Sequence, residues 1–278
     1  MMRKCQGYVD IKKADKVIQK MRSFFQQKGF IESCSQQRRT ILAACEDPPN
    51  VTSYNIGGMK WPLPQTNQMN MEYDLLTDPS LNGLYCLTTS YRNEPNPKPR
   101  HDLTFPLFEF ESKGHFYELV NMCSDLLKFL GYKGEFKEIN YIDACKKYGV
   151  DELNHDHEKM LYEDFGPVVF LKNFPMHTDP FWNMALNPGK RTAKKLDVLL
   201  SGVETFGTAE RSISIHDMRN QFHTVTGGKY AELLFKEFGK DRVERELEDY
   251  FRHDMFRRYE GGIGVTRLIK SMEKEGLM

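Results

Sequence analysis

Residues 84–111 read LYCLTTSYRNEPNPKPRHDLTFPLFEFE and contain two apolar runs separated by a loop. The runs, Leu84 to Arg92 and Leu103 to Glu111, are rich in aromatic and hydroxyl-bearing side chains and predict two strands. Three prolines stiffen the loop from Asn93 to Pro99. Two consecutive strands joined by a short loop favour a hairpin-like antiparallel pair.

Helical and strand-like segments follow on both sides of this pair. Residues 10–29 predict a helix, because apolar residues recur at helical spacing up to Gly29, and Phe30 begins a strand. Residues 46–83 are rich in Pro, Asn and Gly and predict an irregular, loop-rich segment. Further helices are expected at 116–129, twice within 138–165, across most of 215–257 and at 265–274, and further strands at 168–171, 180–186 and 196–200.

The order of these segments predicts an α+β fold in which helices flank an antiparallel sheet. A chain of 278 residues is long enough for a sizeable core. No internal repeat, low-complexity tract or linker divides it, so we expect one domain over residues 1–278.

The composition indicates which classes of partner are favoured. Lys plus Arg and Asp plus Glu are 39 each, so the formal net charge is zero, which disfavours a dedicated nucleic-acid binder. The six cysteines form no CxxC pair, which favours reduced thiols over a zinc site. The first ten residues lack an apolar core, and no apolar run approaches the about 20 residues that span a bilayer. We therefore expect a soluble, cytoplasmic protein without a membrane partner.

Three segments carry residues suited to phosphate and metal chemistry. They are YRNE at 91–94 with the strand that follows, DVLLSGVETFGTAER at 197–211, and GGIGVTR at 261–267. Planar, permanently charged guanidinium groups suit phosphate oxygens. Carboxylates on rigid strands can hold Mg²⁺ between themselves and nucleotide phosphates. Glycines let a backbone approach a ligand, and an aromatic ring offers a face to a base. Taken singly, an Arg-x-Glu sequence is usually a surface ion pair and a GGxG sequence is usually a turn.

Together, in this order, the three segments resemble the motifs of class II aminoacyl-tRNA synthetases. YRNE, followed by Arg100 and a strand with Phe105, is similar to motif 2, and GGIGVTR is similar to motif 3. Asp197, Glu204 and Arg211, each seven residues after the last, resemble the aspartate/asparagine branch. The ending GGIGVTRLI is also similar to that of ammonia-dependent asparagine synthetase, which has the same catalytic fold.

The resemblance implies a class II synthetase-like sheet, ATP and Mg²⁺ as cofactors, and a role for each matched residue. Arg92 and Arg267 would be catalytic through the α- and γ-phosphates, Asp197 and Glu204 would hold Mg²⁺, and Arg211 would recognise an acidic or amide side chain. The ATP-binding set that it implies is Arg92, Glu94, Arg100, His101, Phe105, Asp197, Glu204, Gly262, Gly264 and Arg267.

The sequence departs from the family pattern in several places. It leaves no room for the N-terminal anticodon-binding domain, so we expect none. Motif 1 lacks its proline, and the helix that carries substrate ligands before motif 2 is shortened. Leu107 stands where the aspartate branch uses a polar residue. Other side chains must then hold the amino acid, and the candidates are Glu46, Gln65, Gln68 and Glu109.

The expected reaction is attack of an amino-acid carboxylate on the α-phosphorus of ATP, which gives an acyl adenylate and pyrophosphate. Our first hypothesis for the acceptor is ammonia or a small amine, giving an amide, because the charge is balanced and no anticodon-binding domain is expected. A second is transfer to tRNA, which is less favoured, or to a carrier. A third is a non-catalytic regulatory paralog. A homodimer is expected from the family alone.

Overall fold

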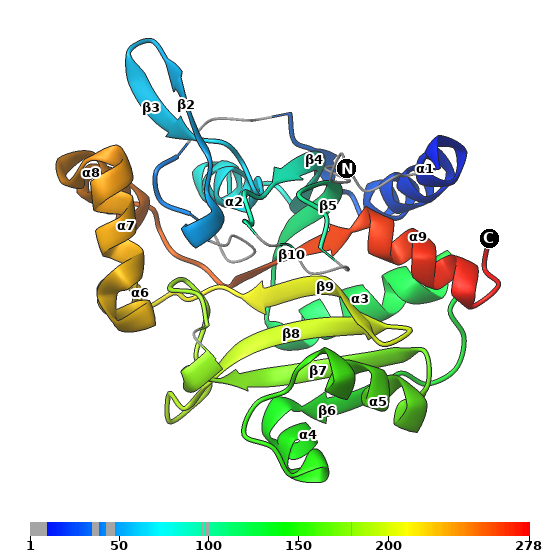
Figure 1. Ribbon diagram of the computed structural model, residues 1–278. Coiled ribbons are helices and arrows are strands. Elements are labelled where there is room, and N and C mark those ends of the chain that lie inside the picture. Colours follow the sequence, from blue (N-terminus) through cyan, green and yellow to red (C-terminus); the bar gives the residue numbers. More distant parts are fainter. Residues whose placement is uncertain (1–9, 35–38, 43–47, 96, 98–100, 179) are drawn as a thin grey trace.

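A computed structural model describes residues 10–34, 39–42, 48–95, 97, 101–178 and 180–278. In this part of the chain eight strands form one sheet in the order β1-β4-β5-β10-β9-β8-β7-β6 (Figure 1). The strands of this sheet are β1 (Ile31–Glu32), β4 (Gly83–Tyr91), β5 (Thr104–Lys113), β6 (Lys137–Asn140), β7 (Val168–Pro175), β8 (Thr192–Leu200), β9 (Val203–Glu210) and β10 (Arg258–Gly264).

The sheet is antiparallel except at its two edges. There β1 pairs with β4 and β6 pairs with β7 in parallel. The C-terminal strand β10 inserts between β5 and β9, so motifs distant in the sequence become neighbours. The expected α+β fold with helices flanking an antiparallel sheet is confirmed.

The helices of the described residues are α1 (Ile11–Gln27), α2 (Gln68–Thr77), α3 (Phe116–Leu130), α4 (Tyr141–Tyr148), α5 (His155–Phe165), α6 (Ile215–Thr224), α7 (Lys229–Phe238), α8 (Lys240–Phe251) and α9 (Val265–Lys274). Local sequence sets their ends. The Asp10 carboxylate accepts from the backbone N–H of Lys12 at 3.0 Å and caps α1. Helix α3 ends at Gly131, whose φ of 112° is readily available only to glycine.

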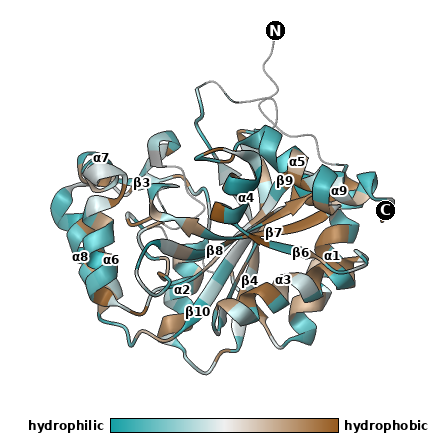
Figure 2. Cartoon of the chain, turned by 90° about the horizontal axis from the view of Figure 1, so that it is seen from below, coloured by the Kyte–Doolittle hydropathy of each residue, from teal (hydrophilic) through white to brown (hydrophobic). Residues whose placement is uncertain are grey.

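Two apolar clusters position the helices. The larger one joins α1, α3 and α9 to the sheet through side chains such as Phe25, Phe108, Leu126 and Leu268. The second joins α6, α7 and α8 around Trp182, which is fully buried. Figure 2 shows hydrophobic colouring concentrated in the strands around β7, whereas α8 is largely hydrophilic. None of the described helices combines the length and the apolar character needed to cross a bilayer.

Two local predictions were wrong. Residues 46–83 were expected to be irregular, but they contain the hairpin β2 (Ser53–Ile56) and β3 (Met59–Pro62) and the helix α2. Gly57 and Gly58, both at positive φ, form the turn of this hairpin. Residues 180–186 were expected to form a strand, but they make only isolated bridges through Met184 and Leu186. The segment has an apolar pattern because its Trp182 is fully buried against the helices α6, α7 and α8.

Candidate active site

A cavity of about 430 Å³ lies where the three motif segments meet. Arg92 and Glu94 follow β4, Phe105 lies on β5, Glu204 on β9 and Arg267 on α9. Their meeting depends on the insertion of β10 between β5 and β9, because α9 starts directly at the end of β10. The wall is formed by these five with His101, Asp102, Leu107, His155, Thr178, Pro180, Phe181, Met184, Lys195, Thr205, Gly207, Thr208, Ala209, Arg211, Glu260, Gly262, Gly264 and Thr266.

One end of the cavity carries partly exposed charges beside an aromatic ring. The guanidinium of Arg92 lies 5.4 Å from the centre of the Phe105 ring. The Glu94 carboxylate lies 2.9 Å from Nδ1 of His101, which holds the two sides of the intervening loop together. A permanent cation beside an aromatic face is suited to a ligand that has both a phosphate and a base.

Arg267 lies in the first turn of α9 and reaches across to β9. Its Nη1 donates to the backbone carbonyl of Glu204 at 2.7 Å, which fixes the guanidinium at the cavity wall. Gly264 precedes the helix, and a Cβ there would meet only ordinary contacts, so Gly264 does not require the absence of a side chain. By contrast, a Cβ on Gly261 would come within 2.5 Å of the Phe110 ring, so that glycine is needed for packing between strands.

Asp197 and Glu204 form the candidate metal site. Burial raises the pKa of Asp197 to about 7, the neighbouring Lys195 ammonium lowers it, and the Glu204 carboxylate raises it further. Lys195 Nζ lies 2.8 Å from Asp197 Oδ2, while the buried Oδ1 has no hydrogen-bond partner within the described residues. An unsatisfied carboxylate oxygen beside a second carboxylate fits a hard divalent cation such as Mg²⁺.

The described residues contain no group of three or more His, Cys, Asp or Glu side chains that could hold a metal. Asp197 and Glu204 alone would therefore have to be completed by oxygens of a ligand and of water, which is how Mg²⁺ is commonly held beside phosphates.

Arg211 lies at the other end of the cavity and is fully buried. It follows β9, and its backbone N–H donates to the carbonyl of Arg258 on the neighbouring strand at 2.8 Å. Its Nη1 donates to Oδ1 of Asn183 at 3.1 Å, and its Nη2 forms an ion pair with Glu260. Glu260 also lines the cavity and is 1% exposed. Arg211 thus reaches the cavity with a carboxylate already beside it.

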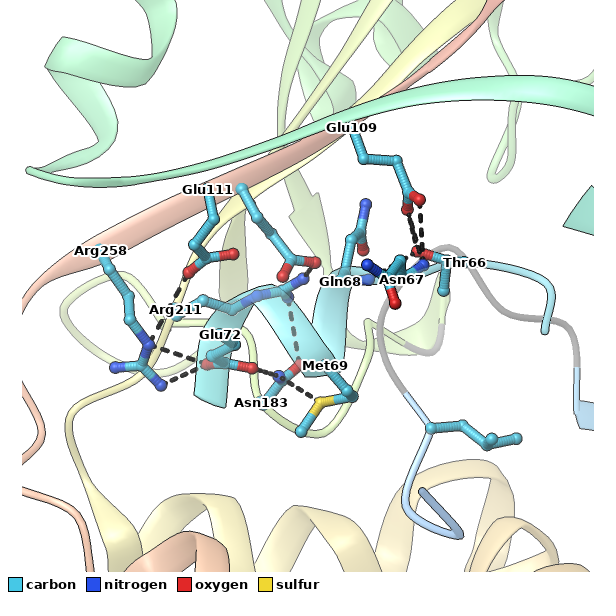
Figure 3. Close-up of polar contacts among 12 residues, drawn as sticks. Thr66, Asn67, Gln68, Met69, Glu72, Glu109, Glu111, Asn183, Arg211 and Arg258 are labelled. Atoms are coloured by element: carbon cyan, nitrogen blue, oxygen red, sulfur yellow. Dashed lines mark hydrogen bonds and ion pairs between the residues drawn. The ribbon is translucent and has the colours of Figure 1, made fainter. Parts of the chain in front are cut away.

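A second buried ion pair, Arg258 with Glu72, lies beside Arg211 (Figure 3). Arg258 donates from Nε to Oε1 of Glu72 at 2.8 Å, and Asn183 links that carboxylate to Arg211 through its amide. Burial, and then the Glu72 carboxylate, raise the pKa of Glu111 well above its ordinary value. Arg258 therefore lies between two buried carboxyl groups, because its Nε is also 3.9 Å from Oε1 of Glu111.

Glu109, Gln65 and Gln68 are fully buried, and the structure does not place them among the cavity-lining residues. Glu109 accepts hydrogen bonds from the hydroxyl of Thr66 and from the backbone N–H of Asn67, the latter at 3.0 Å (Figure 3). Burial raises its pKa to about 7. Substrate binding by these three side chains stays a prediction. Glu46 and Arg100 lie outside the described residues.

Sequence reasoning missed Glu260 and Lys195, which both line the cavity. A signal for Glu260 was present. Alternate residues of a strand share a face, so Glu260 lies on the same side of β10 as Gly262 and Gly264. The resemblance to motif 3 points only to the glycines and Arg267 of GGIGVTR, whereas the structure places GGIG in β10 together with Glu260. A carboxylate two residues before a cavity-facing glycine could have been added to the candidate site.

The geometry agrees with the comparisons with known proteins. The family model described as "tRNA synthetases class II (D, K and N)" matches residues 2–269. The chain belongs to this class II synthetase family. Asparagine–tRNA ligase of Pelotomaculum thermopropionicum is 24% identical over 194 residues, which is 58% of the chain and 44% of that protein. Lysine–tRNA ligase of Shewanella sediminis is 22% identical over 189 residues, which is 60% of the chain and 37% of that protein.

Solved structures show the same fold. Asparaginyl-tRNA synthetase from Pyrococcus horikoshii, complexed with asparaginyl-adenylate, superposes with a TM-score of 0.76 at 21% identity, covering 95% of this class II synthetase domain and 65% of that chain. A putative aspartyl-tRNA synthetase from Leishmania major superposes with a TM-score of 0.72 at 16% identity, covering 94% and 61%. The domain spans less than half the length of the two curated relatives. These relatives give no support to ammonia as the acceptor, which was our first hypothesis.

Proposed function

We propose that this domain activates an amino acid with ATP, forming an aminoacyl adenylate and releasing pyrophosphate. The observation that carries the proposal is the meeting of Arg92, Phe105 and Arg267, from motifs far apart in the sequence, around one cavity with Glu204. The fold and the family of the domain support the same reaction.

The chain's own residues act by position and charge. Arg92 binds the α-phosphate and Phe105 stacks on adenine, while Arg267, anchored on the Glu204 carbonyl at 2.7 Å, binds the γ-phosphate. Negative charge that develops on the phosphate oxygens is stabilised by these fixed guanidiniums. Asp197 and Glu204 would hold Mg²⁺, which neutralises phosphate charge when bound. The expected need for Mg²⁺ and the expected homodimer both remain predictions.

In-line attack by a carboxylate oxygen needs a positioned nucleophile rather than a strong general base. The carboxylate is already ionised at neutral pH, so the protein needs neither a Ser-His-Asp nor a Cys-His arrangement. The α-phosphorus–oxygen bond to pyrophosphate breaks as the new acyl–phosphate bond forms. Lys195 and His101 also line the cavity and add positive or titratable groups near the phosphates.

For the acceptor we propose the 3′ end of a tRNA. The curated relatives quoted above are tRNA ligases, and this favours tRNA over ammonia. The neutral net charge predicts that binding to tRNA alone is weak and strongly salt-dependent.

Amino-acid-dependent exchange of labelled pyrophosphate into ATP tests the activation step, with the common amino acids tried one at a time in the presence of Mg²⁺. Exchange with at least one amino acid supports the proposal, and no exchange with any of them contradicts it. Adding tRNA, ammonium or hydroxylamine in separate reactions then identifies the acceptor. Amide formation with ammonium but no acylation of tRNA would overturn the tRNA assignment.

A further inference from the structure

The end of the cavity at Arg211, where the side chain of an amino-acid substrate would lie, contains a cation and an anion in direct contact. Arg211 and Glu260 form an ion pair, both line the cavity, and neither is more than 1% exposed. A ligand that reaches this end therefore meets one hydrogen-bond donor group and one acceptor group side by side, with no net charge between them.

The surrounding groups do not alter that balance. Arg258 is paired with Glu72, and Asn183 is neutral and bridges Glu72 to Arg211. Glu111 lies 3.9 Å from Nε of Arg258, and burial raises the pKa of its carboxyl group well above the ordinary value. Glu109 is the next carboxyl group on the same strand, and it is turned to Thr66 and Asn67. The cavity end has one arginine and one carboxylate of its own.

We propose that Glu260 determines the specificity of this site and makes it select an amino acid with an uncharged amide side chain. The inference rests on the proposed activation reaction. The amide oxygen accepts from the Arg211 guanidinium, and the amide nitrogen donates to the Glu260 carboxylate. Both groups of the site are then satisfied by one planar ligand group.

The site rejects both anionic and cationic side chains of a substrate. A carboxylate would compete with Glu260 for the single guanidinium in a buried place, where two anions cannot both be compensated. An ammonium group could pair with Glu260 but would lie against Arg211. The register of β10 places Glu260 opposite Ala209, which is too small to separate it from the cavity. Specificity therefore comes as much from repulsion between the site and a charged substrate side chain as from attraction of the amide.

Pyrophosphate exchange with asparagine, glutamine, aspartate and lysine tests the inference in the parent and in three variants. In the parent we expect one of the two amides to exceed aspartate and lysine in kcat/KM by about a hundredfold. In Glu260→Gln the carboxylate that neutralises Arg211 is lost. The ratio of kcat/KM for aspartate to kcat/KM for asparagine should therefore rise by about a hundredfold. Glu260→Asp keeps the charge and should keep the preference for the amide.

Glu210→Gln is the matched control. Glu210 is a buried carboxylate on the neighbouring strand β9, paired with Lys194, and it does not line the cavity. Its loss should leave the ratio unchanged. Aspartate activated by the parent as well as the amides, or an unchanged ratio in Glu260→Gln, overturns the inference.

Binding separates this inference from the proposed reaction. Calorimetric titration with the sulfamoyl-adenosine analogues of asparaginyl and aspartyl adenylate needs no turnover. Tighter binding of the asparaginyl analogue by the parent, reversed in Glu260→Gln, supports the inference even where exchange is absent. Equal binding of both analogues, or binding of neither, overturns it. Thermal unfolding of each variant shows that the protein is folded when it is titrated.

Discussion

The two ends of the cavity present their charges in opposite ways. At the nucleotide end, Glu94 and His101 are paired with each other, and their side chains are 21% and 26% exposed. At the other end Arg211 and Glu260 are also paired, but they are only 0% and 1% exposed. Water-accessible groups can exchange their contacts for a charged ligand at little cost, whereas a buried, compensated pair can only distinguish ligands by how well they replace its contacts.

This difference also separates catalysis from stability. A buried ion that loses its partner is strongly destabilising, while an arginine at a water-accessible wall can be removed with little effect on folding. Variants at the two ends should therefore divide into those that unfold the domain and those that stop its chemistry.

Arg258→Met is expected to give the largest effect. It removes the cationic partner of the buried Glu72, and we expect the free energy of unfolding to fall by about 3–5 kcal/mol. Urea unfolding followed by circular dichroism measures it. Arg219→Met is the control, because the Arg219–Glu248 pair is exposed and should contribute about 0–1 kcal/mol. Equal losses in both variants would mean that the buried cluster has no special role.

Arg267→Ala should lower catalytic activity while leaving the stability of the domain nearly unchanged. It removes one fixed donor from the nucleotide end, so pyrophosphate exchange should fall by about 10²–10³-fold. The melting temperature should change little, because Arg267 is only partly buried. An exchange rate equal to that of the parent would remove Arg267 from the phosphate site.

Arg211→Leu should act on the amino acid rather than on ATP. We expect KM for the amino acid to rise by at least about tenfold while KM for ATP stays within about twofold. The variant also leaves Glu260 buried without its cation, so the double variant with Glu260→Leu should recover part of the lost stability. Steady-state exchange kinetics at varied concentrations of each substrate provide the measurement. A parallel rise in both KM values would place Arg211 in the nucleotide site.

The pH dependence of stability gives the smallest effect. The pKa of Asp197 is about 7 in the folded state and near its ordinary 3.8 when unfolded, so between these values the folded state binds the extra proton. Stability should therefore fall as pH rises from about 4 to about 7. Asp197→Asn should reduce this fall, to which the buried Glu109 with its pKa of about 7 also contributes. The variant should be more stable than the parent at pH 8 by at least about 1 kcal/mol without Mg²⁺.

Chemical unfolding at pH 4, 6 and 8 measures that difference. The same variant should lose Mg²⁺-dependent exchange, because a neutral amide is a poor substitute for an ionised ligand. A fall of the same size in the parent and in Asp197→Asn would show that the pKa of Asp197 is not raised in the folded state.

Much of the nucleotide end could be predicted from the sequence. Arg92, Glu94, Phe105 and Arg267 lie next to predicted strand ends and helix starts, and all four line the cavity. Helix α2 could not be predicted in the same way, because its residues QMNMEYDLLT are buried almost all round and show little amphipathic periodicity. The expected strand at 180–186 failed for the related reason that a tertiary contact, the burial of Trp182 among helices, produced its apolar pattern.

The sequence by itself determined the fold family, the order of the motifs and the side chains offered to phosphate, because these depend on local patterns and on spacing along the chain. Only the tertiary structure decided which charges neutralise one another. Arg211 meets Glu260 because of where β10 lies between β5 and β9 and in which register. A shift of one residue would turn Glu260 to the opposite face of the sheet. Burial then makes the pairing obligatory, since an uncompensated charge is too costly inside a protein.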